Sequence, residues 1–197
     1  WRILILMGIL LAVFALARPQ WGAKVTRIEQ KGLDIVIAID TSKSMLAQDI
    51  KPSRLEKAKY ELGKLIDILE GDRIGVVAFA GTAFTLCPLT LDYAAAQLFL
   101  ESITTDIVPE PGTCLADAIS AALENFQKEE QKFKVILLLT DGEDHCKEMG
   151  RDPVKSAEEA KKQGAVIYTV GIGGTEGAPI PLIDESGNLE YKRDESG

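Results

Sequence analysis

The sequence predicts an α/β domain with a doubly wound, mostly parallel sheet that has one short antiparallel edge strand. Three observations favour this class. From Leu33 onward, apolar runs alternate with amphipathic segments, as in parallel βαβ units. Two of the runs, "RIGVVAFAG" and "KVILLLTDG", are apolar almost throughout, as in strands covered on both faces. The composition, 46% hydrophobic and 26% charged, is that of a globular protein.

Five segments are expected to form the sheet. Four are apolar runs bounded by turn residues, and the fifth is expected to pair antiparallel with the run before it across Gly81. In chain order they are "LDIVIAID", "RIGVVAFAG", "TAFTLCPL", "KVILLLTDG" and "AVIYTVGIG". The last run is expected to be as buried as the others. Beyond Gly174 the sequence predicts an exposed hairpin around Ser186 and Gly187.

Helix signals separate these strands. Ser53 can cap a helix, with Glu56 reaching back to complete a capping box. Further helices are expected from Leu91 to Ile103, from Thr113 to about Phe126, and from Asp152-Pro153 to Gly164. In a sheet of this kind the functional site lies beyond the carboxyl ends of the strands.

The first residues are of another kind. An uncharged run from Ile3 to Ala17, about 15 residues, would span roughly 22 Å of a hydrocarbon core about 30 Å thick. Trp1 and Trp21 flank it as interfacial anchors would, and its lack of a polar face disfavours a buried core helix. The favoured interpretation is part of a membrane helix in contact with lipid. The alternative is a secretory signal, because "ALA" at 15 to 17 suits a signal peptidase.

Four parts are therefore expected: a partial transmembrane helix (1–17), a juxtamembrane linker (18–32), the α/β domain (33–175) and a hairpin-like extension (176–197). Four basic residues between 18 and 31 favour a cytoplasmic domain, but this rule compares the loops on both sides of a helix, so the side stays open. The net charge of -8 and the pI near 4.8 argue against a nucleic-acid partner, which requires a positive surface.

The cysteine spacing predicts neither a disulfide framework nor a metal site. Cys87, Cys114 and Cys146 are odd in number and lack C-x-x-C spacing, so neither a set of disulfides nor a zinc ribbon is implied. The favoured interpretation is that all three are small, semi-buried apolar residues.

Three segments bring oxygen-bearing side chains to the carboxyl edge of the predicted sheet. If the chain stays extended past the first strand, alternation places one carboxylate and two hydroxyls on one side and points Thr41 and Lys43 away. A threonine at a helix start and an aspartate after the fourth apolar run complete the set. The five candidate metal ligands are Asp40, Ser42, Ser44, Thr113 and Asp141.

This set of ligands predicts both the metal and its use. Two carboxylates and three hydroxyls are hard oxygen donors, which suit Mg²⁺ or Mn²⁺. A dedicated calcium cage would recruit more carboxylates, so these ligands leave the ion incompletely neutralised. We therefore expect the site to accept an Asp or Glu carboxylate from a protein partner.

The residues "DTSKS", with Thr113 and Asp141, resemble the metal-ion-dependent adhesion site (MIDAS) of von Willebrand factor A domains, and the likeness covers about Leu33 to Gly174. Stretches such as "ALARPQWG", "GDRIGVVAFAG" and "TDGEDH" are similar to the membrane-anchored bacterial Bat aerotolerance proteins, BatA and BatB. Cys114, where a small residue is usual, and His145-Cys146 depart from the family pattern.

The resemblance implies a binding module, a location in the bacterial inner membrane with flanking membrane helices, and a divalent metal. It also implies other Bat proteins and a MoxR-type AAA+ ATPase as partners, and a last helix of the domain after Gly197.

The alternative function is an enzyme. A magnesium-dependent phosphoryl-transfer enzyme of the haloacid-dehalogenase or receiver type would use Asp40 as nucleophile. The dehalogenase pattern, however, needs a second aspartate where Ser42 stands, and Lys43 is expected to point away from the site. His145, the one histidine, has no evident serine or cysteine partner for a triad, and no P-loop motif is present. We therefore expect no catalytic residues.

Overall fold

The computed structural model describes residues 1–16, 32–126, 133–147, 150–174, 178–183 and 189–191, and the chain divides into two compact units, residues 1–30 and 31–197. In the first unit, α1 (Arg2–Leu16) is a helix of 15 residues whose sequence after Arg2 is apolar. The predicted membrane segment is thus helical where it is described. Among the described helices, none combines the length and the apolar character that a membrane crossing requires.

The second unit contains the predicted α/β domain. Its sheet has the strand order β3-β2-β1-β4-β5, in which β3 is antiparallel to β2 and the other pairs are parallel. In chain order its elements are β1 (Asp34–Asp40), the 3-10 helix η1 (Lys43–Leu46), α2 (Arg54–Asp67), β2 (Arg73–Phe79), β3 (Ala83–Thr90), α3 (Tyr93–Glu101), α4 (Leu115–Glu124), β4 (Lys134–Thr140), α5 (Pro153–Lys162), β5 (Ala165–Gly171), β6 (Pro181–Ile183) and β7 (Leu189–Tyr191). The expected class, a mostly parallel sheet with one antiparallel edge strand, is confirmed.

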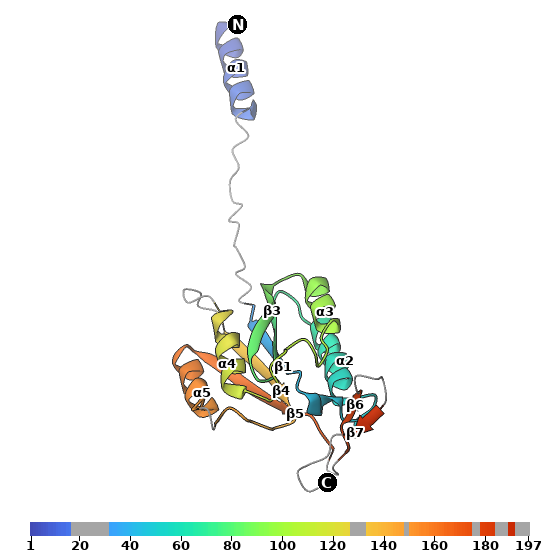
Figure 1. Ribbon diagram of the computed structural model, residues 1–197. Helices are drawn as coiled ribbons and strands as arrows, with labels where there is room; N and C mark the ends of the chain where they lie inside the picture. Colours follow the sequence, from blue (N-terminus) through green and yellow to red (C-terminus); the bar gives the residue numbers. More distant parts are fainter. Residues whose placement is uncertain (17–31, 127–132, 148–149, 175–177, 184–188, 192–197) are drawn as a thin grey trace. The chain divides into compact units, whose positions relative to one another are not determined.

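Helices cover both faces of this sheet (Figure 1). Along β1, Ile35, Ile37 and Ile39 pack in the core cluster beneath α2 and α3. Val36 and Ala38 pack in a second cluster with α4 and α5. All seven residues of the strand are buried, because its side chains alternate between two covered faces. This central strand therefore reaches the carboxyl edge with its last side chain held by packing on both sides.

Strand β5 is less buried than the sequence predicts. Its Val166, Tyr168 and Val170 side chains are 51%, 59% and 39% exposed, although they lie beside β4 on the face that carries α2 and α3. No described element covers this part of the sheet face. The expectation of a buried last strand is therefore wrong, because an apolar sequence shows what a strand can pack against but not whether a neighbour is there.

The helix signals hold with small differences. The Ser53 hydroxyl accepts the Glu56 amide at 3.2 Å, while the Glu56 carboxylate pairs with Lys59. Helix α4 begins two residues later than predicted, so Thr113 lies in the segment before the helix. Strands β6 and β7 form the expected antiparallel pair, and the turn predicted between them lies outside the described residues.

Candidate metal centre

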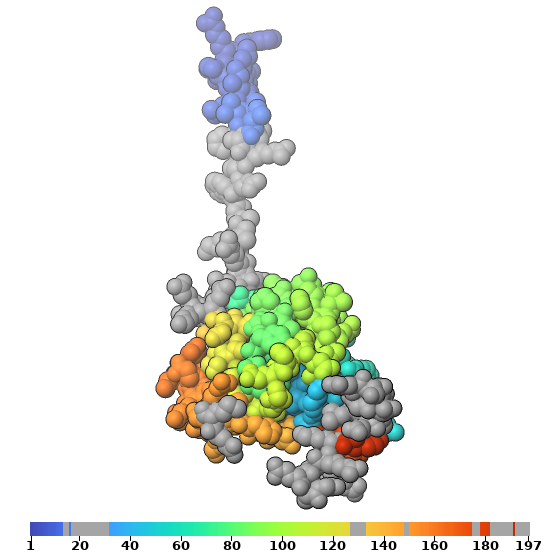
Figure 2. Space-filling view, in the orientation of Figure 1, coloured from blue at the N-terminus to red at the C-terminus, as the bar shows by residue number. Residues whose placement is uncertain are grey.

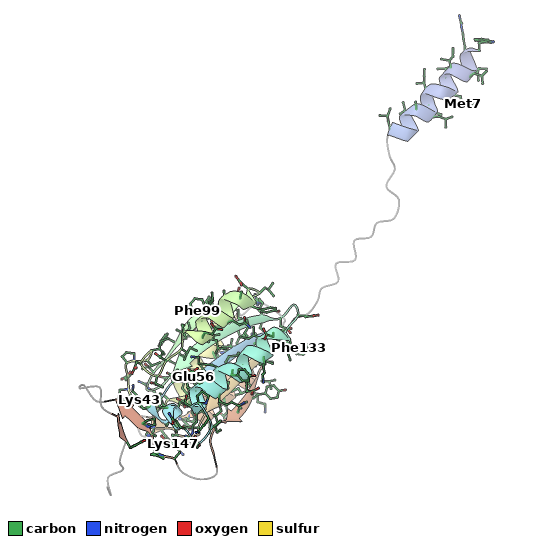
Figure 3. The ribbon with its side chains drawn as sticks, turned by 90° about the vertical axis from the view of Figure 1, so that its right-hand side faces the viewer. Met7, Lys43, Glu56, Phe99, Phe133 and Lys147 are labelled. Carbon is green, nitrogen blue, oxygen red and sulfur yellow. A yellow bond between two sulfur atoms is a disulfide. The ribbon has the colours of Figure 1, made fainter. Side chains whose placement is uncertain are left out.

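The candidate site lies at the carboxyl edge of the two central strands. Because β1 and β4 are parallel neighbours, with Ile39 opposite Leu139, the chain leaves both strands at the same edge. In Figure 3, Lys43 and Lys147, which follow these strands, lie at one end of the domain, and Phe133, which precedes β4, lies toward the other. Topology thus brings together side chains that are far apart in sequence.

Asp40, at the end of β1, is fully buried. Its Oδ1 accepts the Ser42 amide and its Oδ2 accepts the Thr140 hydroxyl, each at 2.8 Å. Burial, with a smaller contribution from the neighbouring Asp141 carboxylate, raises the pKa of this carboxyl to about 6 against the lowering effect of the hydrogen bonds from Ser42 and Thr140. No basic side chain of the described residues contacts Asp40. Its negative charge is therefore held where a cation would stabilise it.

The two serines meet through a turn and not through an extended strand. The chain enters η1 at Lys43, so the alternation expected past Asp40 is wrong beyond the strand end. The turn nevertheless brings Ser42 Oγ within 2.9 Å of Ser44 Oγ. Thr41 points elsewhere, since its hydroxyl donates to the Phe79 carbonyl. The side chain of Lys43 pairs with Asp106 in the loop after α3.

Two further candidate ligands carry polar atoms without partners. Thr113 is 1% exposed and the Asp141 side chain is 3% exposed. Thr113 Oγ1 and Asp141 Oδ1 are the buried side-chain polar atoms that lack a hydrogen-bond partner among the described residues. Such an atom destabilises a fold by about 1–3 kcal/mol and calls for an explanation. Both atoms belong to residues that the sequence predicts as ligands, so the donor set fits a hard divalent cation.

Arg54 belongs to this edge although the sequence did not single it out. Its Nη1 donates to Asp141 Oδ2 at 3.0 Å, and its Nε and Nη2 contact the Asp49 carboxylate. Asp49 also accepts the Gly174 amide, and the hydrogen bonds from Arg54 hold the pKa of Asp49 well below its usual range. One oxygen of Asp141 is thereby fixed and the other left without a partner. The one sequence signal is a basic residue in the first turn of a helix, where the macrodipole disfavours it.

A disulfide lies beside the site. Cys114 and Cys146 are bonded, with Cα atoms 5.1 Å apart, so the expectation that every cysteine is a simple apolar filler is wrong for this pair. Cys87 is free and buried. The pair is separated by 32 residues and has no characteristic spacing, so only the fold reveals it.

A cleft of about 230 Å³ opens over the site. Ser42, Ser44 and Thr113 contribute to its lining, and the exposed Glu143 and His145 form part of its rim. On the face seen in Figure 2, the blue surface of the residues after β1 borders the yellow-green surface of the segment before α4. Three of the candidate ligands therefore share a cleft that is open to a partner.

The described carboxylates around the site do not gather into a cluster that could hold a metal without the hydroxyls. No group of three or more His, Cys, Asp or Glu side chains that could hold a metal is present in the described part of the chain. The candidate set depends instead on hydroxyls beside two carboxylates. Asp141 lies near enough to Asp40 to raise its pKa, Ser42 bonds to Asp40 and approaches Ser44, and Thr113 joins the two serines at the cleft.

Sequence comparison identifies the family of the chain. The family model for the von Willebrand factor type A domain matches residues 34–192, from the first residue of β1 to beyond β7. The chain belongs to this family. The match takes in the β6–β7 pair, which the sequence had suggested as an extension of the domain.

Two solved structures of Bat-type proteins are similar to this chain in both sequence and fold. The VWA chain is 42% identical to BatB from Bacteroides thetaiotaomicron, with a TM-score of 0.75 over 84% of this chain and 78% of that one. It is 39% identical to an aerotolerance-related membrane protein from Bacteroides fragilis, with a TM-score of 0.71 over 84% and 83% of the two chains. The resemblance to Bat proteins is confirmed.

A curated relative from Borreliella burgdorferi, an uncharacterized protein, is 34% identical over 93% of this chain, which spans 53% of that protein's length. Two more distant proteins share the fold alone: the mussel byssus protein PTMP1, at 21% identity, was solved with zinc in its MIDAS motif, and the TRAP protein of Plasmodium vivax, at 18%, was solved loaded with manganese. Divalent metal sites therefore occur on this fold.

Proposed function

We propose that this VWA domain is a metal-dependent docking module. Its five candidate ligands hold one Mg²⁺ or Mn²⁺, and the cleft above them receives an Asp or Glu side chain of a partner protein. The observation that carries the proposal is the pair of buried oxygens without partners, Thr113 Oγ1 and Asp141 Oδ1. A fold tolerates such atoms when a bound ligand satisfies them.

Residues around the candidate ligands hold the two carboxylates in place. The Ser42 amide and the Thr140 hydroxyl hold Asp40 in one orientation, while Arg54 fixes one oxygen of Asp141. These contacts preorganise both carboxylates, so little conformational entropy is lost on binding. When bound, a divalent cation supplies the positive charge that attracts a partner's carboxylate, because two carboxylates at most balance it and the hydroxyls add no charge.

The module is proposed to work at the bacterial inner membrane. Residues 1–17 are the proposed lipid-embedded part, supported by the apolar helix α1 and by the description of the B. fragilis relative as a membrane protein. Other Bat proteins and a MoxR-type AAA+ ATPase are the partners that the family likeness favours. These assignments concern a larger assembly, of which this chain provides the docking domain.

The structure gives no support to phosphoryl transfer. A nucleophilic aspartate must be reached by a phosphate ester, which is far larger than a metal ion, but Asp40 is fully buried. Lys43 lines the cleft, but its ammonium group pairs with Asp106. The docking module is therefore the better account of the same residues.

Titration calorimetry on the full chain in detergent tests the metal site. We expect binding of Mg²⁺ and Mn²⁺ that is lost in Asp141→Asn and kept in Asp106→Asn, a matched carboxylate on the cleft that lies outside the ligand set. Equal binding by both variants would show that the ligands are misassigned.

Capture of partners from membranes of the source organism tests docking. We expect the proteins that EDTA releases from the parent to be the same ones that Asp141→Asn fails to capture. Asp106→Asn should still capture these proteins. Capture that is unchanged by EDTA would reduce the ion to a structural role.

A further inference from the structure

Thr113 and Asp141 belong to two segments that the disulfide joins. Cys114 follows Thr113 directly, and Cys146 lies five residues after Asp141. Beside the sulfur bond, the His145 amide donates to the Thr113 carbonyl at 2.9 Å. The covalent link therefore lies close in sequence to both residues that carry unpartnered oxygens.

The Thr113 segment is fixed to the sheet without the disulfide. The Cys114 amide donates to the Ala80 carbonyl at 2.7 Å, and the Gly81 amide donates to the Glu110 carbonyl at 3.0 Å. Gly81 lies so close to this segment that a Cβ atom on residue 81 would be 2.5 Å from the Pro111 carbonyl oxygen. Opening the sulfur bond would leave these contacts in place.

Among the described residues, the loop of residues 142–147 is held to this segment by one short hydrogen bond, from the His145 amide to the Thr113 carbonyl at 2.9 Å, while the contacts of Asp144 are long. The amides of Leu115 and Cys146 lie 3.4 and 3.5 Å from Asp144 Oδ1, which is long for N–H···O hydrogen bonds. Among the described residues, the disulfide is the one covalent bond between side chains. It therefore holds the less supported loop against the better supported segment.

These two segments are neighbours in the lining of the cleft, to which Thr113, Glu143 and His145 all contribute. We propose that the Cys114–Cys146 bond is a positioning device for the docking site. It ties the loop that follows β4 to the Thr113 segment and so holds the loop in its binding arrangement. This inference rests on the proposed metal-dependent docking.

The proposal makes the site sensitive to dithiols. A dithiol passes two electrons and two protons to the bond, which becomes the thiols of Cys114 and Cys146, while the dithiol becomes a disulfide. Both sulfurs belong to buried residues, 0% and 1% exposed, so the attacking thiolate reaches them only when the 142–147 loop opens. By linkage, if reduction weakens metal binding by a given factor, the metal makes reduction less favourable by the same factor.

The experiment compares oxidised and dithiol-reduced chains in detergent by Mg²⁺ calorimetry and by amide exchange at His145. Thiol counting should find one free thiol before reduction, that of Cys87, and three after it. We expect reduction to weaken Mg²⁺ binding roughly tenfold, within the usual range of coupling between sites. It should also speed His145 exchange in EDTA. The double variant Cys114→Ala/Cys146→Ala should reproduce both effects and no longer respond to dithiol.

Cys87→Ala is the matched control, because this buried cysteine lies in β3 and is unbonded. It should bind Mg²⁺ as the parent does and keep the full response to reduction. Three free thiols without reductant, or equal affinity and equal exchange in both states, would overturn the inference. If the oxidised chain binds no metal, docking fails as proposed, while the exchange comparison in EDTA still decides whether the bond positions the loop.

Discussion

The two ends of β1 carry the same residue in opposite settings. Asp34, at the amino end, is buried and receives two hydrogen bonds from the Arg73 guanidinium, at 2.8 and 2.6 Å. Asp40, at the carboxyl end, is also buried, but its contacts are an amide and a hydroxyl, and its charged neighbour is another carboxylate, Asp141. One strand thus buries two negative charges and pairs only one of them with a side-chain cation.

The difference separates structure from function along seven residues. A buried carboxylate is tolerated when its cationic partner is built in, and it destabilises the fold when it faces another carboxylate. The amino end of β1 is complete within the chain. The carboxyl end keeps an uncompensated charge, which becomes favourable once a cation from solution binds.

The largest expected effect is at the amino end. Asp34→Asn removes the negative charge from a largely buried ion pair with Arg73, so we expect a loss of about 3 kcal/mol in the free energy of unfolding. Mg²⁺ affinity should be unchanged, because this end lies away from the site. Denaturant unfolding and calorimetry measure the two quantities. A variant as stable as the parent would remove the contrast between the strand ends.

The reverse pattern is expected at the carboxyl end. Asp40→Asn can keep both contacts, because its amide oxygen can accept the Ser42 amide and the Thr140 hydroxyl can accept as well as donate. The unfolding free energy in EDTA at pH 7 should therefore stay equal or rise, because the variant keeps these contacts and removes a buried charge that no cation compensates. Mg²⁺ affinity should fall at least roughly a hundredfold, about 2.7 kcal/mol. Retained affinity would show that Asp40 is not a ligand.

The contrast also shows how far sequence reasoning reached. Apolar runs such as "LDIVIAID" and "KVILLLTDG" predict strands from local sequence alone. Because neighbouring strands are expected to be parallel, the residues that follow them are expected at the same edge of the sheet. That was enough to predict the sheet and to propose Asp40 and Asp141 as neighbours. Which faces stay uncovered could not be predicted, and the exposure of Tyr168 on β5 is the result.

What the sequence missed at the site depends on long-range contacts. Arg54 reaches Asp141 across 87 residues, and Cys114 reaches Cys146 across 32. Neither pairing has a spacing that can be read along the chain. The turn that brings Ser44 to Ser42 is local, but it replaces the extended chain on which the alternation argument depended. Topology places elements, and side-chain partners across elements appear only when the fold is known.

A third prediction extends the contrast to pH. Asp49 resembles Asp34, because it has a built-in cation in Arg54, which lowers its pKa. A lowered pKa gives stability that is present above the unfolded value of about 4 and is lost as the pH falls through the folded value. Asp49→Asn should therefore cost about 2 kcal/mol at pH 7 and progressively less below about pH 4. Denaturation at both pH values measures it, and a difference that does not change with pH would contradict the ion pair.

The smallest expected effect compares two buried threonines at the same edge. The Thr41 hydroxyl donates to the Phe79 carbonyl at 3.0 Å, whereas Thr113 Oγ1 has no partner among the described residues. Valine has the shape of threonine without the hydroxyl. Thr41→Val should therefore lower the unfolding free energy in EDTA by about 1 kcal/mol, because it leaves a buried carbonyl with one bond fewer.

Thr113→Val should do the opposite, because it removes an atom whose burial is uncompensated when the metal is absent. We expect the unfolding free energy in EDTA to stay equal or to rise by about 1 kcal/mol. With saturating Mg²⁺ the order of the two variants should reverse, since Thr41→Val keeps the five ligands and Thr113→Val loses one of them. Ligand binding to the native state adds stability that grows with its concentration, so unfolding curves over a Mg²⁺ series separate the cases. If Thr113→Val gained as much stability from Mg²⁺ as Thr41→Val does, the unpartnered hydroxyl would be a packing accident and not a ligand.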